Sequence, residues 1–195
     1  MIKVGLCGTI GSGKSTVCRM FEQLGVAIYI ADDRAKELMN CDKSLVDSII
    51  KAFGSECYLN GELNRKYLAS QIFTDDSKRL QLNSLVHTVV CRHFCEWADA
   101  QSGDYVIVES AILFESGLKD VVDYTVAVVA PADVAIERAM ARDGATREAV
   151  MSRMAVQMSA EQLQSRADFT IENISLQSTK AQVADVDRAL RDEIS

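Results

Sequence analysis

The chain has 195 residues, enough for one α/β domain with a short inserted subdomain, and 48% of them are apolar, as in ordinary globular domains. Its 21 basic and 28 acidic side chains give a net charge of −7, which argues against a nucleic-acid-binding or membrane-binding surface. No apolar run approaches the roughly 18 residues that a membrane-spanning helix needs, and the first residues show no targeting pattern. We therefore expect a cytoplasmic protein without membrane or nucleic-acid partners.

The stretch GTIGSGKST at residues 8–16, the phosphate loop, matches the spacing G-x-x-x-x-G-K-[ST] in full. Apolar residues at 2–7 predict a buried strand before it, and the spacing after it predicts a helix from Lys14. In this context backbone N–H groups and the helix dipole converge on phosphate. Lys14 is expected to reach the β- and γ-phosphates of a bound nucleotide, and the Ser15 hydroxyl to ligate Mg²⁺. The predicted nucleotide-binding residues of the loop are Gly8, Gly11, Ser12, Gly13, Lys14, Ser15 and Thr16.

The rest of the chain alternates strands and helices. An apolar strand at 26–30, expected to be buried on both faces, precedes a mostly helical stretch at 42–101. Later strands are predicted at 105–108, 123–130 and 169–171, and helices at 131–143, 147–158 and 179–194. This order predicts the α/β P-loop NTPase fold, with a five-stranded parallel sheet flanked by helices. We expect one domain made of a core (1–40, 102–141 and 167–195), a helical insertion (41–101) and a lid (142–166).

Two acidic positions follow strands and should share the edge of the sheet that carries the phosphate loop. Ligands collect at the carboxyl ends of parallel strands, so Asp32 is expected to orient an acceptor hydroxyl and accept its proton. The alternative is that Asp32 or Asp33 only caps the next helix, and we take Asp33 as a cap or a surface charge. Glu109 is a candidate for the Mg²⁺ shell, or alternatively a plain polar residue at a strand end.

Four arginines flank the helix break at Asp143-Gly144. Arg138 and Arg142 share one helix face, and Arg147 and Arg153 follow on the next helix. Arginines on both sides of a short break are typical of a mobile lid over phosphates, so we expect two of the four to contact the transferring group. The alternative is a solvated helix face.

The six cysteines form no C-x-x-C pair and are expected to be buried thiols in a reducing compartment. A metal site of Cys91, Cys95 and His87 or His93 is the weaker alternative, because zinc sites usually show tighter paired spacing. Arg65 and His87 lie in the helical insertion, and their local sequence does not distinguish them from ordinary surface or core residues.

Together these residues resemble the dephospho-CoA kinase family, nearly from end to end. The similar stretches are GTIGSGKST, Ala31-Asp32, NGELNR at 60–65 with Leu68 and Ile72-Phe73, Leu85-Val86-His87, ILFE at 112–115, Arg138 to Asp143, Thr146-Arg147, Arg153, Gln157, and ADFTIEN at 167–173. The resemblance implies ATP- and Mg²⁺-dependent phosphorylation of the ribose 3′-hydroxyl of dephospho-CoA, the last step of coenzyme A synthesis.

The resemblance also implies residue roles. Catalysis would rest on Asp32, Lys14 and Arg142. Arg65 and His87, in an acceptor-binding insertion, would face dephospho-CoA together with Asp32. Arg138 and Asn173 would bind the nucleotide, with Asn173 near the adenine. The chain departs from the family pattern at four positions: Ile30 stands where an aspartate is usual, Thr88 and Ala111 where proline is favoured, and Asn64 where aspartate is common.

Two other functions stay open from the sequence. Another P-loop small-molecule kinase, acting on a nucleoside, a nucleotide or shikimate, would share the loop and differ in the insertion. A GTPase switch or a nucleotide-gated binding module would share only the nucleotide site. The chain has no Asn-Lys-x-Asp segment of the kind that reads guanine, and a pure binder would transfer no phosphoryl group.

Overall fold

The computed structural model describes residues 1–73 and 75–193. Its main sheet has five strands in the order β2-β5-β1-β6-β7, and every pairing in it is parallel. This confirms the predicted parallel sheet. The strands are β1 (Ile2–Gly8), β2 (Ala27–Ile30), β5 (Tyr105–Glu109), β6 (Tyr124–Val129) and β7 (Phe169–Glu172).

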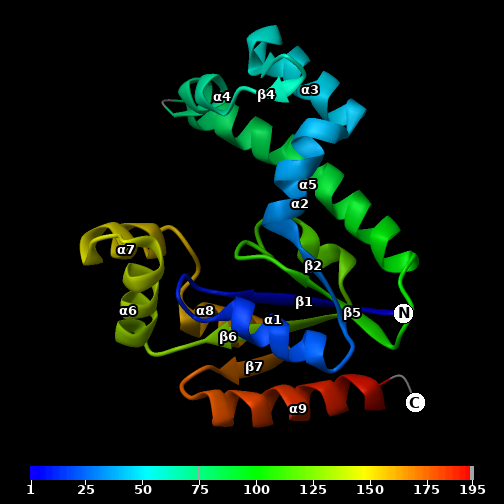
Figure 1. Ribbon diagram of the computed structural model, residues 1–195, viewed down its shortest axis with the longest axis vertical. Helices are drawn as coiled ribbons and strands as arrows, with labels where there is room; N and C mark the ends of the chain where they lie inside the picture. Colours follow the sequence, from blue (N-terminus) through cyan, green and yellow to red (C-terminus); the bar gives the residue numbers. More distant parts are fainter. Residues whose placement is uncertain (74, 194–195) are drawn as a thin grey trace.

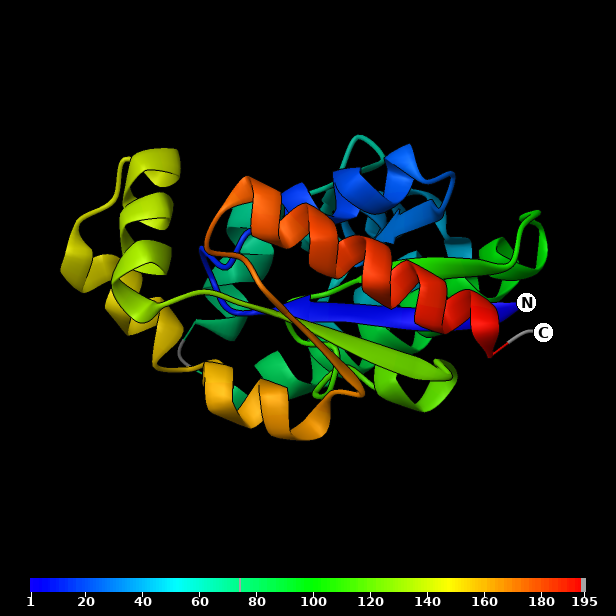
Figure 2. The ribbon, with the colours of Figure 1, turned by 90° about the horizontal axis from the view of Figure 1, so that it is seen from below.

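Alternate residues of the strands enter two separate cores, as the two-residue period of a strand requires. On one face of β5, Ile107 packs with helices α1 (Lys14–Gln23) and α9 (Leu176–Asp192). On the other face, Val106 and Val108 pack with α5 (Asp76–Asp99) and α8 (Ala160–Arg166). Figure 2 shows α9 and α8 on opposite sides of the sheet. The α-helices outside the stretch 42–101 are α1 (Lys14–Gln23), α2 (Ala31–Cys41), α6 (Ala132–Asp143), α7 (Arg147–Met154), α8 (Ala160–Arg166) and α9 (Leu176–Asp192).

The strand predicted at 26–30 is present, and both of its faces contact an apolar core as predicted: Ala27 and Tyr29 face one core, and Val26 and Ile28 face the other. β2 is an edge strand, since it pairs only with β5, and of its four residues Tyr29 alone is buried. With one edge of the strand unpaired, its other three residues are half-buried. The Tyr29 ring packs between His93, Phe94 and Trp97 of α5, which anchors the insertion to the sheet.

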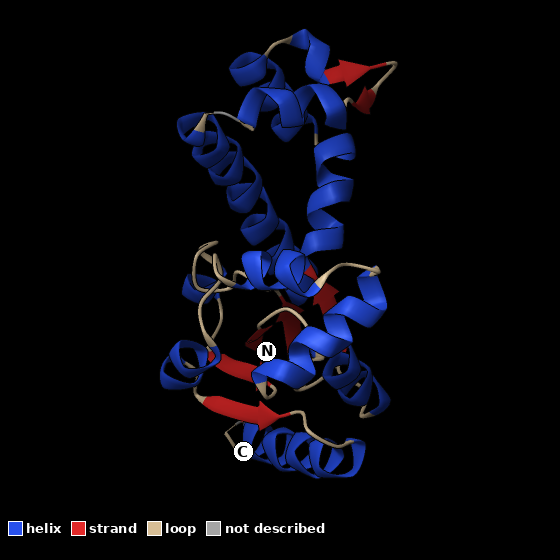
Figure 3. Cartoon of the chain, turned by 90° about the vertical axis from the view of Figure 1, so that its left-hand side faces the viewer, coloured by secondary structure: helices blue, strands red, loops and turns tan. Residues whose placement is uncertain are grey.

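The stretch between 42 and 101 is mostly helical, as predicted, and it extends away from the sheet (Figures 1 and 3). It also contains a two-stranded hairpin that the helical spacing concealed. The hairpin turns at Asn60-Gly61, where both residues have positive φ, and this dipeptide is a strong local hairpin signal. The elements are α3 (Lys43–Phe53), η1 (Ser55–Cys57), β3 (Tyr58–Leu59), β4 (Glu62–Leu63), α4 (Arg65–Ile72) and α5 (Asp76–Asp99).

The later helices differ in their bounds from the sequence prediction. α7 ends at Met154, before the predicted 158, and the unpredicted α8 follows it. A capping box begins α8: the Ser159 hydroxyl and the Gln162 side chain each accept the other's backbone N–H. α9 begins at Leu176, earlier than predicted, and its predicted end at Ile194 lies outside the described residues.

Two expectations about the cysteines need correction. Cys41 is exposed and Cys91 and Cys95 are half-buried, so only half of the six are buried thiols. Among the described residues, no group of three or more histidine, cysteine or acidic side chains is placed to hold a metal ion, which removes the Cys91/Cys95 alternative. Within the same residues no helix is long and apolar enough to cross a membrane. The cytoplasmic location stays a prediction.

Candidate active site

The phosphate loop has a backbone shape that only glycine accommodates at two positions. Gly11 and Gly13 have φ values of 76° and 92°, in the left-handed region. A Cβ atom on Gly11 would lie 1.9 Å from the Ala135 carbonyl oxygen, and one on Gly13 would lie 1.9 Å from Nδ2 of Asn173. α1 begins directly after Gly13 and has no side-chain cap. A phosphate could therefore bind the N–H groups of its first turn without displacing a side chain.

Ser12 provides a direct test of whether phosphate fits this loop. Its side chain is fully buried, and within the described residues its Oγ has no hydrogen-bond partner. A buried hydroxyl without a partner costs free energy, and a phosphate oxygen would satisfy it. The loop residues therefore fit a nucleotide's phosphates. The Ser15 hydroxyl and the Glu109 carboxylate are oxygen donors of the type that Mg²⁺ prefers.

Lys14 and Glu109 meet at the base of the loop. Lys14 Nζ donates to the Gly8 carbonyl at 3.0 Å and lies 3.8 Å from Oε1 of Glu109, with both side chains only 14% exposed. Burial raises the pKa of the Glu109 carboxyl, and the nearby Lys14 ammonium partly opposes this. The end of β5 thus places an acid beside the loop lysine, as the order of the strands predicts.

Asp32 lies in the first turn of α2 and is exposed, whereas Asp33 pairs with Lys36 at 2.8 Å. The capping alternative is wrong for both aspartates, because α2 begins at Ala31 and its N-cap residue Ile30 makes no side-chain cap. Asp33 is a surface charge. The carboxylate of Asp32 also acts on the charge of Glu109, so the two acids share one electrostatic environment.

A hollow of about 70 Å³ brings Asp32 and His87 together. Ser110 and Ser116 complete its polar lining, and burial lowers the pKa of the His87 imidazole. His87 is therefore neutral at pH 7 and presents one donor and one acceptor. Arg65 does not line this hollow; it begins α4 in the insertion and is exposed. Asn64, one of the family departures, caps α4 by accepting from the Tyr67 N–H.

Three arginines of the predicted lid are paired with carboxylates. Arg142 donates to both oxygens of Asp143 at 2.7 and 3.1 Å, and Arg153 donates to the same carboxylate at 2.9 Å. These hydrogen bonds lower the pKa of Asp143 to about 2. Arg147 pairs with Asp133. Arg142, Arg147 and Arg153 are therefore each paired with a carboxylate of the protein.

The sequence of this chain matches known proteins over nearly its whole length. The family model for dephospho-CoA kinase matches residues 2–178. This chain belongs to the dephospho-CoA kinase family. The predicted activity, that of a dephospho-CoA kinase, is confirmed, and with it the P-loop kinase class.

Relatives and solved structures agree with this assignment. A dephospho-CoA kinase of Bacteroides fragilis is 39% identical over 173 residues, which cover 88% of this chain and 84% of the relative. A crystal structure from Thermus thermophilus has a TM-score of 0.84 and 30% identity, with 96% of each chain covered. A dephospho-CoA kinase of Campylobacter jejuni has a TM-score of 0.70 at 21% identity, covers 99% of this chain and 98% of its own, and shows the shared fold.

A second hollow in this kinase, of about 240 Å³, lies between Arg138 and the loop that follows β7. Arg138 donates to the carbonyls of Asn173 and Ile174 at 2.9 and 3.4 Å, which orients its guanidinium along the wall. Nδ2 of Asn173 donates to the Ser12 carbonyl, and its Oδ1 accepts from the Thr179 hydroxyl. Asn173 therefore shapes both the hollow and the phosphate loop, with its side-chain amide already bonded to protein.

Two residues near the site had no role assigned from the sequence. Gln157, part of the family resemblance, bonds the phosphate loop at Ile10, and Asp143 pairs with two arginines. The helix break at Asp143-Gly144 is visible in the sequence, but the pairing of its carboxylate with Arg153 is not. Only the fold brings these partners within reach.

Proposed function

We propose that the chain transfers the γ-phosphoryl group of ATP to the ribose 3′-hydroxyl of dephospho-CoA, with Mg²⁺. The observation that carries this proposal is the convergence at one sheet edge of the phosphate loop, Glu109 and the Asp32 hollow. Glu109 supports it most directly, because its carboxylate lies 3.8 Å from Nζ of Lys14 at the base of the loop. The donor and the acceptor alcohol would then meet above the carboxyl end of β5.

The phosphate loop would hold the triphosphate through its backbone N–H groups, the Ser12 hydroxyl and the Lys14 ammonium. Ser15 and Glu109 are the residues that would hold Mg²⁺. When bound, the ion neutralises charge on the β- and γ-phosphates. The adenine would lie in the 240 Å³ hollow, in contact with Arg138 and Asn173, which line it.

Asp32 would orient the 3′-hydroxyl and accept its proton as the new phosphate ester forms. Three features support this role: the carboxylate is exposed, it lines a hollow, and the hydrogen bonds of the described residues leave it available. The neutral His87 imidazole, on the same hollow, would position the acceptor by a hydrogen bond. Arg65, outside that hollow, would contact a more distant part of the acceptor.

The division into core, insertion and lid is part of the same proposal. The residues of 41–101 would bind the acceptor, because α5 supplies His87 to the Asp32 hollow. The segment 142–166 would act as the lid, because its Arg142 and Arg153 pair with the carboxylate of Asp143 and could pair with a phosphate group instead.

Changing Arg142 to alanine is expected to lower kcat by about 10²-fold, the lower end of the range for loss of one hydrogen-bond donor to a transition state. The low value is expected because Arg153, which pairs with the same carboxylate, is still present in the variant. The KM for dephospho-CoA should change much less. Initial rates over a matrix of both substrate concentrations measure the two effects. A larger change in that KM than in kcat would reassign Arg142 to acceptor recognition.

A panel of acceptors tests the proposed substrate. ADP release is measured with ATP and Mg²⁺ alone, and then with dephospho-CoA, adenosine, AMP or shikimate at equal concentration. Dephospho-CoA is expected to be the acceptor that raises release above the alcohol-free rate, and phosphorus NMR should place the new phosphate on the 3′-oxygen. Preferred turnover of another alcohol, or no release with dephospho-CoA, would refute the acceptor assignment.

A further inference from the structure

The phosphate loop is joined to the segment 142–166 through a residue of its variable part, Ile10. The Ile10 N–H donates to Oε1 of Gln157 at 3.1 Å, across 147 residues of sequence. The Ile10 side chain packs against a small core of Ile136, Ala139 and Val150, which come from α6 and α7. Both the backbone and the side chain of one loop residue are therefore held by the lid and the helix that carries it.

The next loop residue adds a backbone contact to the same helix. Gly11 lies so close to α6 that any Cβ atom would overlap the Ala135 carbonyl. Steric contact of this kind transmits displacement, because packed backbone does not compress. A movement of α6 and the lid relative to the sheet must therefore carry Ile10 and Gly11 with it or break these contacts.

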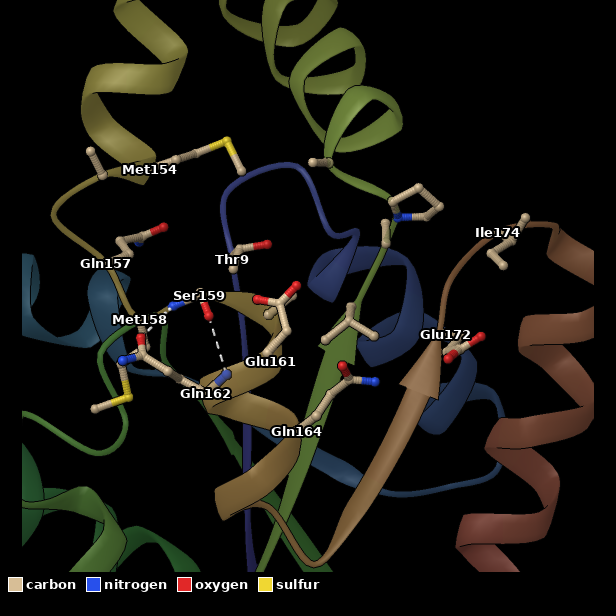
Figure 4. A pocket seen from close by; sticks show the side chains of 16 residues that line it. Thr9, Met154, Gln157, Met158, Ser159, Glu161, Gln162, Gln164, Glu172 and Ile174 are labelled. Atoms are coloured by element: carbon tan, nitrogen blue, oxygen red, sulfur yellow. Dashed lines mark hydrogen bonds between the residues drawn. The ribbon is translucent and has the colours of Figure 1, made fainter.

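Next to Gln157, Met158 packs against the main core, while the segment around them lines a large cavity. Residues 154–162 form one wall of a cavity of about 690 Å³, and Thr9 with the ends of β6 and β7 forms the others (Figure 4). Glu161 and Glu172 line this cavity, and its described lining includes no lysine or arginine, so it does not suit a second phosphate group. In the described part of the chain, the Gln157–Ile10 bond is the only hydrogen bond between 147–162 and the phosphate loop.

We propose that Gln157 is a positioning residue that couples the phosphate loop to the lid. The inference rests on the proposed function, since it takes the loop as the site of the triphosphate. A nucleotide that fixes the backbone of the loop also fixes the Ile10 N–H. The hydrogen bond from this N–H to Gln157 then restrains the segment that carries Gln157. The coupling is reciprocal: a lid held by Gln157 offers the nucleotide a loop already in shape. The same contact sets where Arg142 and Arg153 stand relative to the phosphates.

The test compares three variants at two glutamines. Gln157→Met keeps the length of the side chain and removes the acceptor, Gln157→Glu keeps an acceptor oxygen, and Gln164→Met changes another glutamine of the cavity wall that does not bond the loop. Amide hydrogen exchange is followed in peptides covering 8–16 and 155–159, with and without a non-hydrolysable ATP analogue and Mg²⁺. The Kd of the analogue is measured in parallel.

In the unaltered chain the analogue is expected to slow exchange in both segments. In Gln157→Met it should still slow exchange at 8–16 but no longer at 155–159, and its Kd should rise about 3- to 10-fold, as for loss of one neutral hydrogen bond. Gln157→Glu and Gln164→Met should keep the coupled protection. Gln157→Ser, which adds no apolar bulk, gives the same readout if methionine disturbs folding.

Retained protection of 155–159 in Gln157→Met, or its loss in Gln164→Met as well, would overturn the coupling. Protection of 8–16 without 155–159 in the unaltered chain would overturn it too and leave the nucleotide site standing. No slowing at 8–16 in the unaltered chain would instead refute the proposed nucleotide site, and the coupling with it.

Discussion

Replacing Lys14 with alanine should lower kcat/KM for ATP by about 10³-fold, at the upper end of what one positioned donor contributes. Lys14 is the one basic side chain of the loop, and the lid arginines 142 and 153 are held by Asp143 instead. The substitution also leaves the buried Glu109 carboxyl without its nearby cation. Turnover is measured as ADP release at saturating dephospho-CoA.

Lys36→Ala is the matched control for this variant. Lys36 is an exposed lysine of α2 that pairs with Asp33, so its loss should leave turnover within about twofold, as for ordinary surface changes. Thermal unfolding of both variants establishes that they are folded. A Lys14→Ala enzyme that keeps more than a tenth of its kcat/KM would show that the ammonium does not act on the transferring phosphate.

Asp32→Asn should lower kcat by about 10²- to 10⁴-fold, the range for loss of a general base. The amide keeps the size of the side chain but cannot accept the proton of the 3′-hydroxyl. Since Asp32 is exposed and supports no cap, the folded structure and the Kd of an ATP analogue should be unchanged. Single-turnover rates and equilibrium binding separate the chemical step from nucleotide affinity.

Asp33→Asn provides the comparison at the next position. This carboxylate is exposed and paired with Lys36, so its loss should change kcat only slightly. Equal losses of kcat and nucleotide affinity in Asp32→Asn would contradict a role in proton transfer. A larger loss of kcat in Asp33→Asn than in Asp32→Asn would show that Asp33, and not Asp32, is the general base.

Local patterns in the sequence determined the sheet, the phosphate loop and the strand-end acids. The central strands read as continuous apolar runs because both faces of the sheet are covered, the loop needs left-handed backbone at Gly11 and Gly13, and strands in a parallel sheet end on one edge. The hairpin at Asn60-Gly61 and the capping box of α8 are encoded locally too, by turn and cap residues that the helical spacing of apolar residues does not report.

Tertiary structure alone decided how the site is held. The Ser12 carbonyl is bonded by Asn173, the Ile10 N–H by Gln157, and Arg153 joins Arg142 on Asp143. Ser12 and Ile10 are separated from their partners by 161 and 147 residues of sequence, so no short-range pattern encodes these contacts. They form because the ends of β1, β6 and β7 and the start of α6 meet in one place, and that meeting depends on the packing of the whole sheet.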